Sequence, residues 1–309
     1  MDCTCFSLAR VSGLLSIMLL VLCQLGACQS KPKEAGWHSD LADNLMIISE
    51  EARTRLGAEV PRPDQVAEDW GELVELARER VGSMTGDRAV EVLNQIIFEE
   101  SGFVREIEDD DIRLMLLPYV IERRRGSCLG LAGLYLTLAR ELKLPIKGVL
   151  VPKHFFLRLE KTGGYTNIEL LRKGEQMPDE WYRQKWQVPK KSGAYLRTLS
   201  DSETEAVFLF NLGNVYRLRR MTAKAIRRYR KVTDLFEEFA EAHANLGLVY
   251  QTVADYRQAE LAYQKAAELY PNLPGLVDNL AALKLKLSEK SSAPAQHTQQ
   301  EYKTQQPDQ

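Results

Sequence analysis

Apolar residues follow two different spacings along the chain after residue 60. Over 61–142 they recur every three or four positions, most clearly in 64–81 (DQVAEDWGELVELARERV) and 86–103 (GDRAVEVLNQIIFEESGF). This is the period of an amphipathic helix. Residues 108–125 keep the spacing, but Pro118 cannot occupy the interior of an unbroken helix, so they predict one kinked helix or two short ones.

A further helix is predicted to begin at Cys128. Gly126 breaks the preceding segment, and Ser127 belongs to the residue types that cap a helix by accepting a hydrogen bond from its first N–H groups. The residues that follow, as far as Leu142, are apolar on most sides of a helix. A helix of that kind belongs in a protein core, so we expect this one to be buried.

The spacing changes to period two after residue 145, which predicts strands. Residues 146–151 (IKGVLV), 154–160 (HFFLRLE) and 163–171 (GGYTNIELL) have the alternating and β-branched character of strands. The Gly163–Gly164 pair is typical of a hairpin turn. Together these segments predict a small antiparallel sheet that follows the buried helix.

From 201 to 290 the sequence repeats every 34 residues. The tetratricopeptide pattern has this period; its small residues let paired helices approach, and its aromatic residues fill the space between them. A partial third unit carries Lys284 in place of the aromatic, as expected of a capping helix. The tail 291–309 is rich in Gln and is predicted to be disordered. The repeated positions are Leu212, Gly213, Tyr216, Ala225 and Tyr229, matched by Leu246, Gly247, Tyr250, Ala259 and Tyr263.

The segment 1–27 has the pattern of a secretory signal. Arg10 precedes an apolar stretch, 11–25, which is shorter than the ~18 residues of a membrane-spanning helix. The stretch ends in the letters LGAC, which resemble the lipobox of bacterial lipoproteins. That resemblance implies cleavage before Cys28, attachment of lipid such as palmitate to its sulfur, and anchoring to a membrane surface. Residues 28–60 are then predicted to be a tether.

The residues after the lipobox bear on location. Gln29 and Ser30 follow Cys28, without the aspartate that retains such lipoproteins in the inner membrane of the resembled system. We therefore expect an extracytoplasmic protein that is lipid-anchored to a bacterial membrane, on the periplasmic side of the outer membrane rather than on the inner one. The alternatives are a plain signal peptide or an uncleaved anchor.

Composition and charge exclude several classes of protein. A net charge of −2 gives no general attraction to nucleic acid. The chain has neither the cysteine and histidine spacing of a zinc site nor a glycine-rich phosphate loop, so we expect no metal and no cofactor. Four of the five cysteines lie in the first 28 residues and only Cys128 follows, so the mature chain has no disulfide framework.

Cys128 and His154 are the candidates for chemistry. A thiol at a helix N-terminus, beside an imidazole, is the usual setting of a cysteine nucleophile, because the thiolate is the reactive species. A third polar group must then hold the imidazole in the useful tautomer. Asn167 and Glu169 lie on one face of the next strand, and either can fill that role.

The stretch from RRRGSCLGLAGLYL through KHFFLRL to NIEL resembles the transglutaminase-like superfamily, and most of all the bacterial SirB-type group, in which such a domain precedes tetratricopeptide repeats. The resemblance covers roughly 87–169. It implies an α+β fold, with a papain/transglutaminase-like domain of helices and a small antiparallel sheet (61–200), followed by an all-α repeat domain (201–290). It also implies that Cys128 is the nucleophile and His154 the base. Glu169 falls near the family's aspartate, and Asn167 is the alternative.

Two functions follow from this organisation. One is a membrane-anchored cysteine hydrolase or acyltransferase that acts on amide or thioester bonds of a protein or peptide recruited by the repeats. The other is a non-catalytic scaffold that binds a protein or peptide in the repeat groove. By resemblance to other tetratricopeptide domains, the partner-binding residues are Asn214, Arg217 and Gln251. The first repeat is also strongly basic, which suits a solvated face, an anionic lipid surface or an acidic partner.

Overall fold

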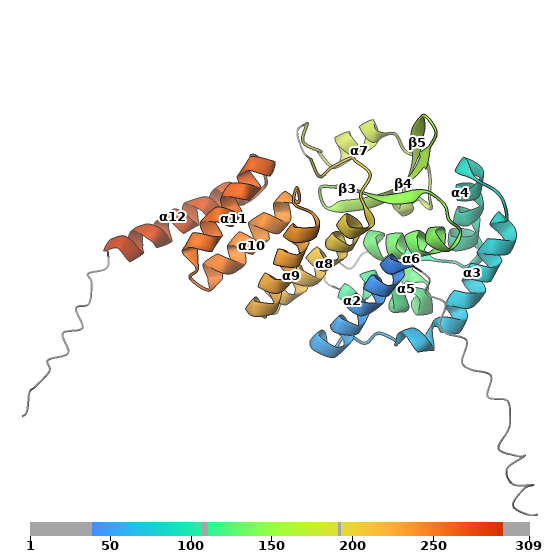
Figure 1. Cartoon of the computed structure of the whole chain (residues 1–309), viewed down its shortest axis with the longest axis horizontal. Helices are drawn as coiled ribbons and strands as arrows, with labels where there is room; N and C mark the ends of the chain where they lie inside the picture. Colours follow the sequence, from blue (N-terminus) through green and yellow to red (C-terminus); the bar gives the residue numbers. More distant parts are fainter. Residues whose placement is uncertain (1–38, 107–110, 191–192, 293–309) are drawn as a thin grey trace, which may run out of the picture. The chain divides into compact units, whose positions relative to one another are not determined.

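The computed structural model describes residues 39–106, 111–190 and 193–292, without the side chains of 290–292 (Figure 1). The predicted signal segment, Cys28 and the tail from residue 293 lie outside the described residues. Within the described ranges, no helix is both long enough and apolar enough to cross a membrane.

The first half of the described chain is helical, as the apolar spacing predicts. Pro118 lies in the first turn of α5, directly after the short η3, so 108–125 does not form one kinked helix. A proline is tolerated at that position because its missing N–H has no partner there in any case. In chain order the elements are α2 (Asp40–Leu56), η1 (Pro63–Gln65), α3 (Ala67–Val81), α4 (Gly86–Asn94), η2 (Gln95–Glu100), η3 (Ile112–Met115), α5 (Leu117–Arg123) and α6 (Cys128–Glu141).

Helix α2 corrects one expectation. The segment 28–60 is predicted to be a tether, yet 40–56 forms a helix capped by Ser39 at one end and by Gly57, at φ 66°, at the other. Leu41, Leu45 and Ile48 are at most 3% exposed and pack into the main core. Their three- and four-residue spacing buries one face of the helix, so this part of the chain belongs to the folded body.

Helix α6 lies at the centre of the helical part. It packs against α5, α2 and the strands β3 and β4 (Figure 1), and its residues from Leu129 to Ala139 are buried. A Cβ atom on Gly130 would lie 2.0 Å from the carbonyl oxygen of Leu114, so only glycine permits this approach. The predicted burial of this helix is therefore observed, and Cys128 is its first residue.

The predicted antiparallel sheet forms in the order β3–β4–β5, with β3 (Ile146–Val151), β4 (His154–Lys161) and β5 (Gly164–Ile168). Val151 pairs with His154 across the first turn, and Arg158 pairs with Asn167 in the second hairpin. After the sheet come η4 (Leu170–Arg172) and α7 (Asp179–Lys185). A separate pair of short parallel strands, β1 (Val104–Arg105) and β2 (Arg125–Gly126), precedes α6.

The repeats form paired helices: α8 (Asp201–Leu218) with α9 (Thr222–Leu235), and α10 (Ala240–Thr252) with α11 (Tyr256–Leu269), followed by α12 (Leu276–Ser292). A Cβ atom on Gly213 would lie 2.9 Å from the ring of Tyr229, and one on Gly247 would lie 2.6 Å from the ring of Tyr263. The repeated Gly–Tyr pairs therefore set how closely each pair of helices packs. The observed architecture is the predicted α+β domain followed by helical repeats.

The two parts share one core. The ring of Phe208 in α8 packs against Gly133 of α6, where a Cβ atom on the glycine would lie 3.2 Å from that ring. Glu51 of α2 accepts hydrogen bonds from the hydroxyl of Tyr216 at 2.6 Å and from Nε of Arg228 at 3.1 Å. The first repeat is therefore held to the helical part by both apolar and charged contacts.

Candidate active site

Cys128 lies at the start of α6, on the wall of a cavity. Ser127 caps the helix, since its Oγ accepts a hydrogen bond from the N–H of Gly130 at 3.2 Å and donates one to the carbonyl of Leu114 at 3.2 Å. The N–H groups of a first helical turn have no partner inside the helix, and they create a positive potential there. The half-buried thiol therefore lies where negative charge is favoured and where backbone donors remain free for a ligand.

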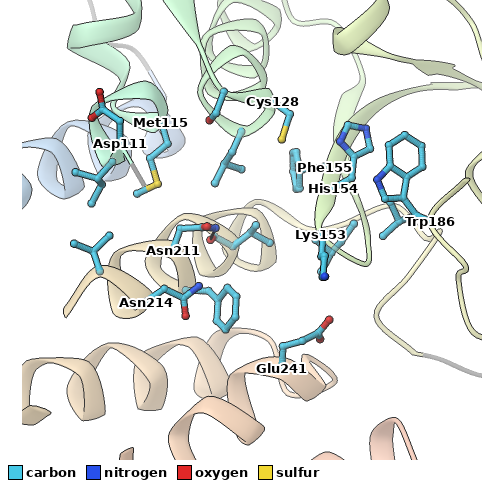
Figure 2. A pocket seen from close by; sticks show the side chains of 18 of the residues that line it. Asp111, Met115, Cys128, Lys153, His154, Phe155, Trp186, Asn211, Asn214 and Glu241 are labelled. Carbon is cyan, nitrogen blue, oxygen red and sulfur yellow. Dashed lines mark hydrogen bonds between the residues drawn. The ribbon is translucent and has the colours of Figure 1, made fainter. Parts of the chain in front are cut away.

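His154 reaches the same cavity from the sheet. The turn formed by Pro152 and Lys153 joins β3 to β4, and Lys153 adopts φ 61°, the left-handed conformation that a type II turn needs at that place. The turn fixes His154 as the first residue of β4, where it is only 5% exposed. Figure 2 shows its imidazole facing the sulfur of Cys128.

Glu169 is the group that holds the imidazole. Its Oε2 lies 2.9 Å from Nε2 of His154, and its Oε1 accepts the N–H of Leu171 at 2.8 Å. The carboxylate is fully buried and caps η4, so its orientation is set by the backbone. Because Nε2 is engaged by Glu169, Nδ1 is the imidazole nitrogen left to serve the thiol.

The surroundings of His154 act on its pKa in opposite directions. Burial lowers the pKa, but hydrogen bonding to Cys128 and to Glu169, together with the negative charges of the two groups, outweighs burial and raises it above the ordinary value. A raised pKa means that the imidazolium form is the favoured partner of a thiolate and a carboxylate. The three side chains therefore form one coupled unit.

Asn167, the alternative orienting residue, belongs to a different cluster. Its Oδ1 accepts from Nε of Arg158 at 2.8 Å, and its Nδ2 donates to Asp179 at 2.7 Å and to the carbonyl of Met177 at 2.9 Å. Arg158 also donates to Asp179 at 2.7 Å. Asn167 thus anchors β5 to the start of α7, and of the two candidates it is Glu169 that contacts His154.

Trp186 covers the histidine and was not found from the sequence. Its ring stacks on the imidazole of His154, with ring centroids 4.2 Å apart and planes 6° from parallel. The ammonium of Lys185 lies 4.7 Å from the centroid of the same indole. A tryptophan in the loop after α7 has no periodic signal that would link it to the histidine. Its position shields the buried His154–Glu169 contact from water on one side.

The cavity has a volume of about 800 Å³ and is lined by both parts of the chain. Cys128, His154 and Trp186 contribute from the helical part and the sheet, and helices α8 and α10 of the repeats supply the facing wall (Figure 2). The polar repeat residues on that wall are Asn211, Asn214, Arg217, Glu241 and Asn245. The thiol site and the repeat surface therefore open into a single space.

The predicted partner-binding residues divide between two locations. Asn214 and Arg217 line the cavity, and Oδ1 of Asn214 accepts hydrogen bonds from the hydroxyl of Tyr229 at 2.7 Å and from Nδ2 of Asn245 at 2.8 Å. Gln251 does not line it; its Oε1 accepts from the hydroxyl of Tyr263 at 3.0 Å. The sequence analysis also missed Asn211 and Asn245, although their separation by one repeat length of 34 was a usable signal.

The arrangement can support acyl transfer. A thiol, an imidazole and a buried carboxylate stand in the order nucleophile, base and orienting group. The backbone N–H of Cys128 is available as a donor to a developing oxyanion. Within the described residues, no group of three or more His, Cys, Asp or Glu side chains is placed to hold a metal ion.

Comparison with known proteins agrees with this geometry. The model of the transglutaminase-like superfamily matches residues 64–206, and that of the tetratricopeptide repeat matches 240–273. The UPF0162 protein PA3419 of Pseudomonas aeruginosa is 31% identical over 201 residues, covering 61% of this chain and 72% of the relative. The protein SirB1 of Salmonella typhimurium is 27% identical over 133 residues, covering 41% of this chain and 46% of the relative.

The chain belongs to the SirB-type transglutaminase-like family. Its resemblance to that family at the sequence level is thereby confirmed, as are the two domain types in their order. Among solved structures, menin, described by its binding site for the Mixed Lineage Leukemia protein, aligns with a TM-score of 0.47 at 12% identity, covering 83% of this chain and 74% of that one. The family's tetratricopeptide repeat indicates protein–protein interaction in general terms.

Proposed function

We propose that this SirB-type protein is a cysteine hydrolase or acyltransferase that acts on amide or thioester bonds of a protein or peptide bound in the cavity. The observation that carries the proposal is the coupled unit of Cys128, His154 and Glu169 on the wall of a cavity shared with the repeats. A thiol at a helix start supplies the nucleophile, and a buried carboxylate fixes the imidazole. The repeats recruit the substrate from the facing wall.

The reaction proceeds through an acyl-enzyme. The thiolate of Cys128 attacks the carbonyl carbon and forms a C–S bond, while the bond to the leaving amine or thiol breaks and the imidazolium of His154 protonates that group. In the second step His154 takes a proton from water or from an acceptor amine, which attacks the acyl carbon. The C–S bond to Cys128 then breaks and the thiolate is restored.

The first test is alkylation of the full chain with iodoacetamide near pH 7, with peptide mapping to follow Cys128 alone. We expect Cys128 to react at least about tenfold faster than glutathione under the same conditions, since an imidazolium partner raises the thiolate fraction. His154→Gln is expected to bring the rate down to that of a free thiol. His243→Gln is the matched control, because His243 lies in a repeat and bonds the carbonyl of Glu237.

A wild-type rate equal to that of glutathione contradicts an activated nucleophile. So does a His154→Gln variant that keeps the full rate while remaining folded by circular dichroism. Turnover itself is then sought with thioester and peptide amide libraries, comparing the wild type with Cys128→Ala.

The second candidate function is a scaffold that uses the cavity without chemistry. It is favoured by the amide-rich wall in which Asn214 and Asn245 bond each other, since side-chain amides hydrogen-bond to peptide backbone. Cys128→Ala and Asn214→Ala variants separate the two functions in cells. A phenotype lost with Cys128→Ala supports the enzyme, and one lost only with Asn214→Ala supports the scaffold.

We further propose that the chain is lipidated on Cys28 and held on the periplasmic side of a bacterial outer membrane, as the lipobox-like letters LGAC suggest. Labelling with an alkyne analogue of palmitate in a bacterial host tests this proposal. Incorporation is expected in the wild type and in the control Cys23→Ser, but not in Cys28→Ser. Equal labelling of all three chains contradicts a lipid on Cys28.

A further inference from the structure

Glu241 presents an incompletely satisfied carboxylate to the cavity. It lies in the first turn of α10, and its Oε1 accepts a hydrogen bond from the hydroxyl of Tyr195. Its Oε2 is buried and has no hydrogen-bond partner among the described residues. Figure 2 shows the carboxylate pointing into the cavity from the wall that faces Cys128. Buried polar atoms normally have partners, so this one indicates a missing ligand group.

The charge of Glu241 fits a cationic ligand. Burial raises the pKa of the carboxyl group, while the hydrogen bonds from Tyr195 and from its own backbone N–H lower it. Its place in the first turn of α10 favours the ionised form, because the helix N-terminus carries positive potential. None of the ion pairs within the described ranges includes Glu241. An ammonium or guanidinium group arriving at Oε2 would satisfy both its hydrogen bonding and its charge.

The same position in the first repeat carries no charge. Val207 stands 34 residues before Glu241 and also lines the cavity. The negative charge is therefore a property of one place in the cavity and is not part of the repeat pattern. The amide side chains of Asn211 and Asn245 lie on the same wall, so a peptide bound there finds neutral amides and one carboxylate.

Lys153 is the cation nearest to this arrangement in Figure 2, where its ammonium points toward Glu241. No ion pair joins the two residues in the described structure, and the side chain of Lys153 is exposed. A bound ligand and Lys153 are thus two possible sources of a positive charge for Glu241, and an experiment must separate them.

We infer that Glu241 is a specificity-determining residue that accepts a positively charged group of the peptide, either a lysine or arginine side chain or a free amino terminus. The inference rests on the proposed function, because the peptide is the substrate whose acyl group Cys128 receives. Its elements are the cavity shared by Cys128 and Glu241, the buried oxygen without a partner, and the lack of a second acid at the equivalent position of the first repeat.

The test uses a panel of N-acetylated pentapeptide vinyl sulfones, which alkylate a reactive cysteine by addition of the thiolate to the double bond. Norleucine is the reference residue, and lysine replaces it at one position at a time. For one position we expect Cys128 of the full chain to react at least about tenfold faster with the lysine probe, as a charge pair in a partly dry site implies. Removing the acetyl group from the norleucine probe tests the amino terminus in the same way.

Glu241→Gln is expected to bring this ratio of rates close to one, because the amide keeps the acceptor for Tyr195 but loses the charge. Glu260→Gln, at an exposed acid of α11, is the matched control and should keep the ratio. A ratio near one in the wild type at every position, or a ratio that survives Glu241→Gln, overturns the inference. A lysine preference that emerges only in Lys153→Met also overturns it, since Lys153 then occupies Glu241.

Failure of the proposed function has a different outcome. If no probe labels Cys128 faster than glutathione, the enzyme proposal fails while the cation site is still testable. The same peptides, without the reactive group and with a fluorophore, are then titrated into Cys128→Ala by fluorescence anisotropy. A lysine preference in affinity that is lost on adding Glu241→Gln supports the site, and equal affinities for lysine and norleucine overturn it.

Discussion

Nε2 of His154 lies 2.9 Å from Oε2 of Glu169, and both side chains are buried. The contact opposes the effect of burial on the imidazole, which by itself lowers the pKa of His154. Without the carboxylate the balance tips toward neutral imidazole, and a thiolate at Cys128 loses its charged partner. The orienting residue therefore controls the charge of the pair as well as its geometry.

The first prediction concerns Glu169→Gln. We expect the rate of Cys128 alkylation by iodoacetamide at pH 7 to fall by roughly tenfold or more, in line with contributions from general acid–base partners. Glu175→Gln serves as control, because Glu175 is exposed and pairs with Arg172 near the same turn. An unchanged rate in a folded Glu169→Gln variant would show that the carboxylate has no part in activation.

The second prediction concerns pH and stability. A histidine whose pKa is raised in the folded state binds its proton more tightly there than in the unfolded chain, where the pKa is about 6.5. Its contribution to the free energy of unfolding is therefore complete below about pH 6.5 and is lost as pH rises through the folded-state pKa. Urea denaturation of wild type and His154→Gln at several pH values should give a stability difference that shrinks with rising pH. A difference that grows with pH contradicts the raised pKa.

The third prediction compares two helical glycines. A Cβ atom on Gly247 would lie 2.6 Å from the ring of Tyr263, whereas one on Gly71 in α3 meets nothing within 4 Å. Gly247→Ala should lower the free energy of unfolding by about 1–2 kcal/mol, because overpacking exceeds the gain in helix propensity. Gly71→Ala should raise it by up to about 1 kcal/mol. Denaturant midpoints measure both, and equal signs for the two changes would be against the tight helix pairing.

The fourth prediction concerns the link between α2 and the first repeat. Glu51 accepts hydrogen bonds from Tyr216 and Arg228, and its side chain is 18% exposed. Glu51→Gln should lower the free energy of unfolding by about 1–2 kcal/mol, as expected for a charged hydrogen bond that is only partly solvated. Glu50→Gln, at a more exposed residue that pairs with Arg53, should change it by less than about 0.5 kcal/mol. Equal effects of the two changes would mean that α2 is not held through Glu51.

Much of the fold could be predicted from local patterns. The three- and four-residue spacing, the switch to alternation after residue 145 and the 34-residue period each depend on residues close in sequence, so they specify helices, strands and repeats without knowledge of the core. Helix α2 was the exception. Its apolar stripe was passed over because it follows a long N-terminal segment, and only its packing against α5, α6 and α8 identifies it as part of the body.

The candidate site could be predicted only in part. Cys128 and His154 stand out because each begins an element, and both lie in the same domain. The choice between Asn167 and Glu169 was open, since the two share a strand face and differ by only about 7 Å along it. The end of β5 at Ile168 decides it, because Glu169 there becomes the cap of η4 and turns its carboxylate to His154.

The sequence by itself determined the order of elements, the helix that begins at Cys128 and the repeat architecture, because hydrophobic period and capping act over a few residues. Only the tertiary structure decided that Trp186 covers the histidine and that Glu241 of the second repeat faces the cavity of Cys128. These neighbours are separated by tens of residues, and contacts of that range depend on how whole elements pack, which no local pattern records.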